Sequence, residues 1–164
     1  HVGTGGTVIT TTDSVGVGSV GINSTAPSAL LDIQGHTKFK TYSENVSFLS
    51  SSSNVVTVDL SSAQTFICTA TESITQFVLT NAPKGSTSFS LRIDQDSTGS
   101  HQVGIDTFKT SGGSSIPVYW PGGVVPQVTT TASRTDLFSF KIFDGDNPVS
   151  AGLYGVVGGQ NFQN

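Results

Sequence analysis

The sequence predicts an all-β protein, and three observations indicate this fold class. Short runs of residues alternate between apolar and polar side chains, which is the pattern of a strand with one buried face. Clusters of Gly, Pro, Asn and Asp separate these runs, as turns do. A helical period is absent from every long window, and the best helical candidate, residues 28–32, would form one turn at most.

The alternating runs predict an antiparallel β-sandwich or jelly roll. Residues 138–142 show the pattern clearly, because three apolar side chains alternate there with Ser139 and Lys141. The apolar set of each run is expected to face a second sheet, and Cys68 is expected to be a small buried side chain in such a run. The predicted strands are residues 56–60, 65–70, 76–80, 89–93, 102–106, 117–120, 138–142 and 153–157.

Composition divides the chain into three parts. Residues 1–43 are rich in Gly, Val and Thr and have no large aromatic side chain before Phe39. Residues 44–54 contain a serine run and are predicted to be a linker. Residues 55–164 contain eight of the 10 Phe and are predicted to form the sandwich, which we expect to be a compact head domain.

The first part predicts a homotrimer. Its apolar runs are short and interrupted by Gly, so they cannot bury their own hydrophobic faces as an independent unit. Intertwining with identical chains about a three-fold axis would cover them, as a short β shaft, and disorder is the alternative. The residues expected to make the trimer contacts are Val15, Val17, Val20, Ile22, Leu31 and Ile33.

Charge and hydropathy exclude several classes of partner. The net charge is -4 and no basic run occurs, so the electrostatic signature of a nucleic-acid-binding protein is missing. No apolar stretch is as long as a membrane-spanning helix, and we expect no insertion into a membrane.

The sequence begins at His1 and contains no Met, so we interpret it as a piece of a longer protein.

Sequence motifs of catalytic, cofactor or metal sites are incomplete in this chain. We therefore predict no enzyme, no cofactor and no metal site. Residues 16–21 match G-x-G-x-x-G but lack the helix that a dinucleotide site requires. Residues 94–99 begin like a calcium loop, yet Ile105 stands where the bidentate acid is needed. Three copies of His36 around a three-fold axis would be able to trap an ion, although an exposed histidine is the simpler interpretation.

Tyr119 and Trp120 are the candidate ligand-binding residues. Aromatic rings stack on the apolar faces of sugars, while N–H and O–H groups bind sugar hydroxyls. The pair therefore suggests a glycan contact. The alternative, which we favour, is that Trp120 seals one end of the sandwich core above the turn at Pro121.

Several segments resemble bacteriophage tail-fibre proteins. Residues 16–27, followed by Leu31-Asp32-Ile33-Gln34-Gly35, resemble a segment found where a fibre shaft meets a head. The second half resembles the C-terminal (distal) region of tail-fibre proteins of marine and cyanobacterial phages. The matching segments are residues 56–60, 94–100, 118–123, 136–140 and 155–162.

This resemblance implies a homotrimeric virion fibre that ends in a β-sandwich head. The expected function is adsorption to the host cell by multivalent binding of a bacterial surface glycan or another host receptor, with other virion proteins attached upstream. A purely structural capsid fibre or adaptor is one alternative. A fragment of a capsule-degrading enzyme is another.

Overall fold

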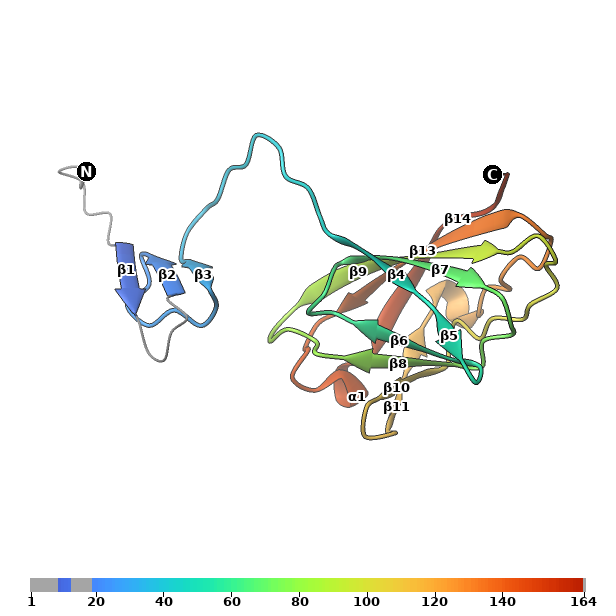
Figure 1. The fold of residues 1–164 in the computed structure, drawn as a ribbon. Helices are drawn as coiled ribbons and strands as arrows, with labels where there is room; N and C mark the ends of the chain where they lie inside the picture. The colour runs from blue at the N-terminus through green and yellow to red at the C-terminus, as the bar shows by residue number, and fades with distance from the viewer. Residues whose placement is uncertain (1–8, 13–18, 164) are drawn as a thin grey trace. The chain divides into compact units, whose positions relative to one another are not determined.

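The computed structural model of the chain describes residues 9–12 and 19–163. The chain divides into two compact units, residues 1–43 and residues 44–164, which we call the N-terminal unit and the head. Strands are the main regular element of both (Figure 1), which confirms the all-β fold class. Residues 28–30, part of the predicted helical turn, form a bend, and the next residues begin a strand.

The N-terminal unit contains one small sheet. Strand β1 (Ile9–Thr12) pairs antiparallel with β2 (Ser19–Ile22), which pairs in parallel with β3 (Leu31–Ile33). The loop between β2 and β3 lies against Gly21, where an added Cβ atom would collide with the Ser24 carbonyl oxygen. Asp32 fixes the same loop, because its carboxylate accepts hydrogen bonds from the Ser28 amide at 3.0 Å and the Ser24 hydroxyl at 3.2 Å.

The head consists of two sheets with their core between them (Figure 1). Five strands form one sheet in the order β11-β10-β8-β6-β5, and six form the other in the order β12-β14-β13-β9-β7-β4. A single-turn helix, α1 (Pro148–Ala151), precedes the last strand. The strands are β4 (Val46–Leu49), β5 (Ser51–Ser52), β6 (Val55–Asp59), β7 (Thr65–Ala70), β8 (Gln76–Thr80), β9 (Thr87–Gln95), β10 (Phe108–Thr110), β11 (Ser115–Ile116), β12 (Val118–Tyr119), β13 (Arg134–Ile142) and β14 (Leu153–Gln163).

The sheets are mixed, so the prediction of antiparallel sheets is wrong. From β6 to β10 each connection crosses from one sheet to the other, and strands two apart in sequence therefore lie side by side and point the same way. In the described part of the head, five of the nine strand pairs are parallel. These pairs depart from a jelly roll, which is built of antiparallel Greek keys. Alternation of apolar residues specifies which face of a strand is buried, but it does not specify which strands pair with it or in which direction they run.

Residues 44–54, predicted to be a linker, belong to the head instead. Within them β4 pairs with β7 at the edge of the six-stranded sheet, and β5 pairs with β6 in the other sheet. The serine run is accommodated because Ser53 and Asn54 turn the chain with positive φ angles of 55° and 65°. A serine-rich segment thus serves as strand and turn when a neighbouring strand satisfies its backbone groups.

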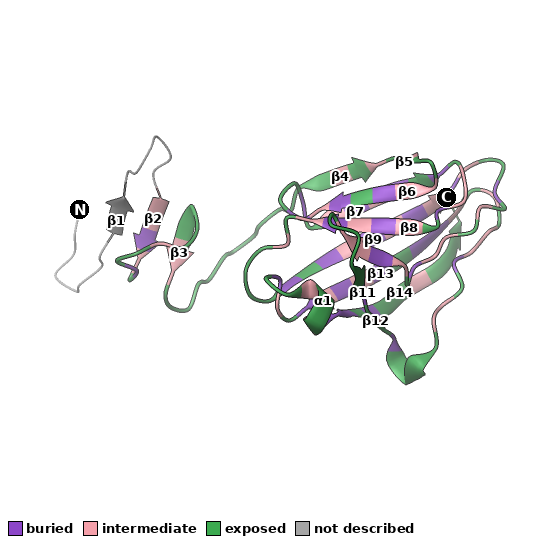
Figure 2. Ribbon diagram, turned by 90° about the horizontal axis from the view of Figure 1, so that it is seen from below, coloured by how far each residue is buried: buried purple, intermediate pink, exposed green. Residues whose placement is uncertain are grey.

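The core contains side chains from both sheets (Figure 2 shows the alternating buried positions along the strands). Phe77 and Phe108, from the five-stranded sheet, stack with ring centroids 5.1 Å apart. Phe89 and Phe140, from the six-stranded sheet, stack at 5.0 Å, and Phe140 contacts Phe108 across the core at 5.2 Å. Because stacked and tilted aromatic pairs add to the free energy of apolar burial, this cluster is expected to stabilise the contact between the sheets.

Cys68 lies on β7 with no exposed surface, which confirms its prediction as a small buried side chain. Burial, together with the negative charge of Asp94, raises the pKa of its thiol to about 11. The reactive thiolate is therefore scarce at neutral pH as well as inaccessible.

The sequence predicted most of the regular strands of the head. The structure confirms residues 65–70 and 76–80 as β7 and β8, with the predicted bounds. The expected strand over residues 102–106 is wrong, because Val103 forms only an isolated bridge with Ile74. Besides β4 and β5 in the predicted linker, the short strands β10 and β11 went unpredicted, because each has too few residues to show a pattern.

Candidate functional site

The predicted ligand-binding pair is divided between the core and the surface. Trp120 is 6% exposed, and its ring packs edge-on against Phe138 at 6.1 Å and Phe140 at 5.7 Å. Gly155 lies against the ring, so that a Cβ atom there would come within 2.6 Å of it. Trp120 is therefore a core residue, the alternative favoured above, and its ring is not free to stack on a sugar.

Tyr119 is exposed and belongs to an aromatic strip, which we define as Tyr119, Tyr154 and Phe143. The Tyr119 and Tyr154 rings have centroids 5.1 Å apart, and Phe143 contacts Tyr154 edge-on at 5.2 Å. All three side chains are about half exposed, at 48%, 46% and 61%. Tyr154 and Phe143 were not predicted as site residues, although alternation along β14 places Tyr154 on the exposed face when Leu153 is buried.

Strand register places the strip on the outer face of the six-stranded sheet. Across neighbouring strands Tyr119 pairs with Tyr154, Tyr154 with Lys141, and Lys141 with Ser88. Side chains at paired positions lie on the same face of a sheet. The next row on this face runs through Val156, Ser139, Ser90 and Thr65.

A polar hollow of about 340 Å³, which we call the serine hollow, lies on the same face. Its lining residues include Ser88, Ser90, Ser139, Lys141 and Glu44. The hollow lies where β7 begins opposite Ser90, because the first residues of β9 have no paired strand on that side. Glu44 stands at its edge, where its carboxylate accepts a hydrogen bond of 2.9 Å from the Thr65 hydroxyl.

An apolar hollow of about 350 Å³ adjoins the serine hollow and shares Ser88, Ser139 and Lys141 with it. Phe143, Tyr154 and Val156 form its apolar side. A third hollow, of about 290 Å³, lies between Tyr119 and Tyr154. Since neighbouring hollows share lining residues, the three form one groove across β12, β14, β13 and β9.

Lys141 provides the positive charge of this groove. Its ammonium group lies 6.0 Å from the centre of the Phe143 ring, at the outer limit of a cation–π contact. Arg92, on the same sheet face, is bound to Asp94 at 2.8 Å. Among the described residues Lys141 takes part in no ion pair, so its charge is available to an anionic ligand.

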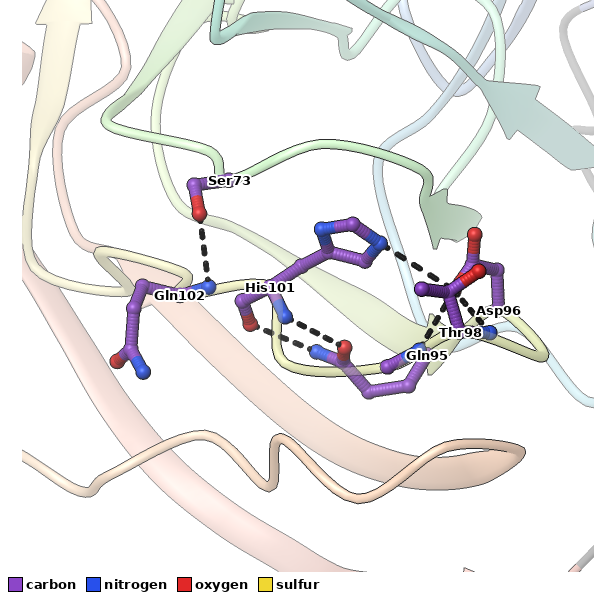
Figure 3. A network of polar contacts seen from close by, with 7 residues as sticks. Ser73, Gln95, Asp96, Thr98, His101 and Gln102 are labelled. Atoms are coloured by element: carbon purple, nitrogen blue, oxygen red, sulfur yellow. Dashed lines mark hydrogen bonds and ion pairs between the residues drawn. The ribbon is translucent and has the colours of Figure 1, made fainter.

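A second polar cluster surrounds His101 and braces the loop after β9 (Figure 3). The Asp96 carboxylate accepts hydrogen bonds from the Thr98 and Gly99 amides, at 2.9 and 2.8 Å, and contacts the His101 ring at 3.2 Å. The side chain of Gln95 binds both backbone groups of His101. The groups of this cluster bond to one another and to the backbone, as in an Asx turn.

Acid is expected to weaken this loop. Hydrogen bonds, chiefly from the Gly99 amide, hold the pKa of Asp96 below its usual range against a smaller opposing effect of desolvation, with further contributions from Thr98 and His101. A carboxyl whose pKa is lowered by folding stabilises the protein above its unfolded pKa of about 3.9, and this contribution is lost as the pH falls through the folded value.

Denaturation measured from pH 6 down to about pH 2 should therefore show a shallower loss of stability in Asp96→Asn than in the parent chain. Asp59 has a lowered pKa for a similar reason, chiefly a hydrogen bond from the Asn81 side chain, so the slope is reduced and not abolished. Asp106→Asn, at an exposed carboxylate, is the control. An unchanged slope in Asp96→Asn would contradict this prediction.

The predicted trimer-contact residues lie in the N-terminal unit. Val15 and Val17 are outside the described residues. Val20 pairs with Leu31, and Ile22 pairs with Ile33, so these four side chains lie on one face of the small sheet. Leu31 is exposed and the other three are only half-buried.

Neither a metal site nor a membrane span is found among residues 9–12 and 19–163. No group of three or more His, Cys, Asp or Glu side chains there has the arrangement of a metal site. No helix in that part of the chain has the length and apolar character needed to span a membrane. Comparison of the chain with protein-family models, with curated proteins and with solved structures found no match.

Proposed function

We propose that the chain is the distal part of a homotrimeric bacteriophage tail fibre, a non-enzymatic virion protein that attaches the particle to polysaccharide on the host surface. The N-terminal unit would be the shaft segment, and the head would carry the binding face. The sequence resemblance supports the viral assignment. The apolar face of the N-terminal unit supports the trimer, because its described side chains are half-buried or exposed, and it is the observation on which the proposal depends.

The small sheet of that unit has one apolar face. Val20, Ile22, Leu31 and Ile33 line this face, whereas the other face holds Gly21 and the loop that packs on it. No apolar side chain described in this unit is buried. A three-stranded sheet of this length needs a covered hydrophobic face to be stable, and two further copies of the same chain would supply the cover.

Attachment would then follow from multivalency. Three heads on one fibre present three copies of the groove on the outer sheet face, and several fibres on one particle multiply them again. Linked weak sites give an avidity that exceeds the affinity of each by orders of magnitude. The proposed function therefore requires binding sites of only modest strength.

Light scattering during size-exclusion chromatography tests the assembly. We expect a mass three times that of the 16.9 kDa chain at micromolar concentration. Leu31→Asp should dissociate the trimer, because it places a charge on the apolar face. Leu30→Asp is the matched control, since it places the same charge at an exposed position just before the strand.

A monomer at micromolar concentration would refute the trimer. Pre-incubation of host cells with the trimeric chain should reduce adsorption of the phage, and an unchanged adsorption rate would refute the attachment role. Antibody labelling of intact virions distinguishes a tail fibre from the alternatives, a capsid fibre or an adaptor. Incubation with host polysaccharide, followed by analysis for released oligosaccharides, tests the remaining alternative, a capsule-degrading enzyme.

A further inference from the structure

The groove on the six-stranded sheet combines three kinds of chemistry along its length. The aromatic strip supplies exposed ring faces, and Val156 extends this apolar side. The serine hollow supplies hydroxyl groups that both donate and accept hydrogen bonds. Lys141 stands where the two meet, because it lines both the apolar hollow and the serine hollow.

This combination matches a carboxylated sugar. A pyranose has apolar C–H faces that stack on aromatic rings and hydroxyl groups around its edge that hydrogen-bond to serine. A carboxylate on the sugar would pair with Lys141, the cation without an ion-pair partner among the described residues of the groove. Glu44, at the far edge of the serine hollow, would accept hydrogen bonds from sugar hydroxyls.

We infer that the groove lined by Tyr119, Tyr154, Phe143, Lys141 and the serine hollow binds an acidic polysaccharide through a carboxylate at Lys141. This inference rests on the proposed attachment role and names the ligand class of that role. The three connected hollows follow one line across four strands, and such a line accommodates several consecutive sugar units of a polymer.

A second copy of this chain is a less suitable occupant of the groove. The serine hollow is concave and polar, so a protein surface that covered it would have to fill the hollow and satisfy its hydroxyl groups. The lysine charge would also need an acidic partner from the other copy. A hydrated polymer with its own hydroxyls and carboxylates meets both requirements without such a matching surface.

Titration calorimetry on the full chain tests the inference. Polygalacturonate, which carries a carboxylate on each sugar, is the acidic probe, and dextran is the neutral one. We expect binding of polygalacturonate that weakens at high salt, because screening reduces the contribution of Lys141. Tyr154→Ala should lower the affinity about tenfold and Lys141→Gln about three- to tenfold, in keeping with one lost stacking contact and one lost partly exposed ionic contact.

Matched controls change the same residue types elsewhere. Lys109→Gln removes a lysine from β10 in the other sheet, and Tyr42→Ala removes an exposed tyrosine from the N-terminal unit, so neither should alter the affinity. Failure to bind polygalacturonate, equal affinity for dextran, or equal loss in the controls would overturn the inference. A change of oligomeric state in Tyr154→Ala would also overturn it, since the face would then be an interface between copies.

The result also separates the inference from the proposed function. A trimer that protects host cells but ignores polygalacturonate would retain the attachment role and lose the acidic ligand. A monomer that binds polygalacturonate through Lys141 and Tyr154 would retain the binding site and lose the fibre.

Discussion

Phe140→Ala is expected to lower the free energy of unfolding of the head by about 3–5 kcal/mol. Phe140 has 1% of its surface exposed, and its ring touches Phe89, Phe108 and Trp120. It therefore joins the two sheets at the centre of the aromatic cluster. Removing the ring loses the favourable free energy of burying it. It also leaves a cavity, because the surrounding strands relax only partially into the space.

The chain carries two reporters of this change. Trp120 is the single tryptophan, so its fluorescence during denaturation with urea reports the head alone. The buried Cys68 thiol should react with a thiol reagent only when the head opens, and faster in Phe140→Ala. Phe143→Ala removes the same side chain from an exposed position and should cost less than about 1 kcal/mol. Equal losses in the two variants would refute the central role of Phe140.

Asp136→Ala is expected to lower the stability of the head by about 2–4 kcal/mol. The Asp136 side chain is 1% exposed, and its carboxylate accepts hydrogen bonds from the amides of Thr129 and Asn161, at 2.7 and 2.8 Å. A third bond, of 3.1 Å, comes from the side chain of Gln160. Alanine would leave the two backbone amides without this acceptor, and they would carry most of the cost, whereas the Gln160 side chain also donates to the Gln127 carbonyl oxygen.

The loss should be concentrated at the end of the chain. Asp136 joins the loop before β13 to the last residues of β14, so hydrogen exchange should accelerate at the Asn161 amide before it changes in β7. Asp136→Asn keeps one carbonyl oxygen and should lose less stability than alanine. Asp106→Ala, at an exposed carboxylate, is the control and should change stability by less than about 0.5 kcal/mol. A loss no greater than that of the control would contradict the prediction.

The sequence predicted the elements of the head better than their partners. Alternation along residues 65–70 and 138–142 identified both strands and their buried sides, because each side chain's direction is fixed locally by the backbone. Pairing is not local: β7 lies beside β9 because the intervening strand belongs to the opposite sheet. No single-strand pattern contains that information, and the antiparallel assumption failed for this reason.

The same distinction explains what was missed in the candidate site. Tyr119 was identified because it stands beside the single tryptophan in the sequence. Its actual neighbour, Tyr154, is contributed by a strand that begins 34 residues after β12 ends (153 minus 119), and their contact depends on parallel pairing of β12 with β14. The serine hollow depends on where β7 begins relative to β9, a fact of register that composition does not specify.

The passage of the chain back and forth between the two sheets has a consequence for how the head acquires its shape. Neighbours such as β6 and β8 are separated in sequence by a whole strand of the opposite layer, so few ladders can form as isolated hairpins. The loops must close, at a cost in entropy, before the hydrogen bonds between the paired strands can form and offset this cost. Folding is therefore expected to be slow. In the folded head the strands β6, β7, β8 and β9 alternate between the two sheets. Detachment of any one of them would therefore disturb both sheets. Such a head is expected to fold slowly and to unfold slowly.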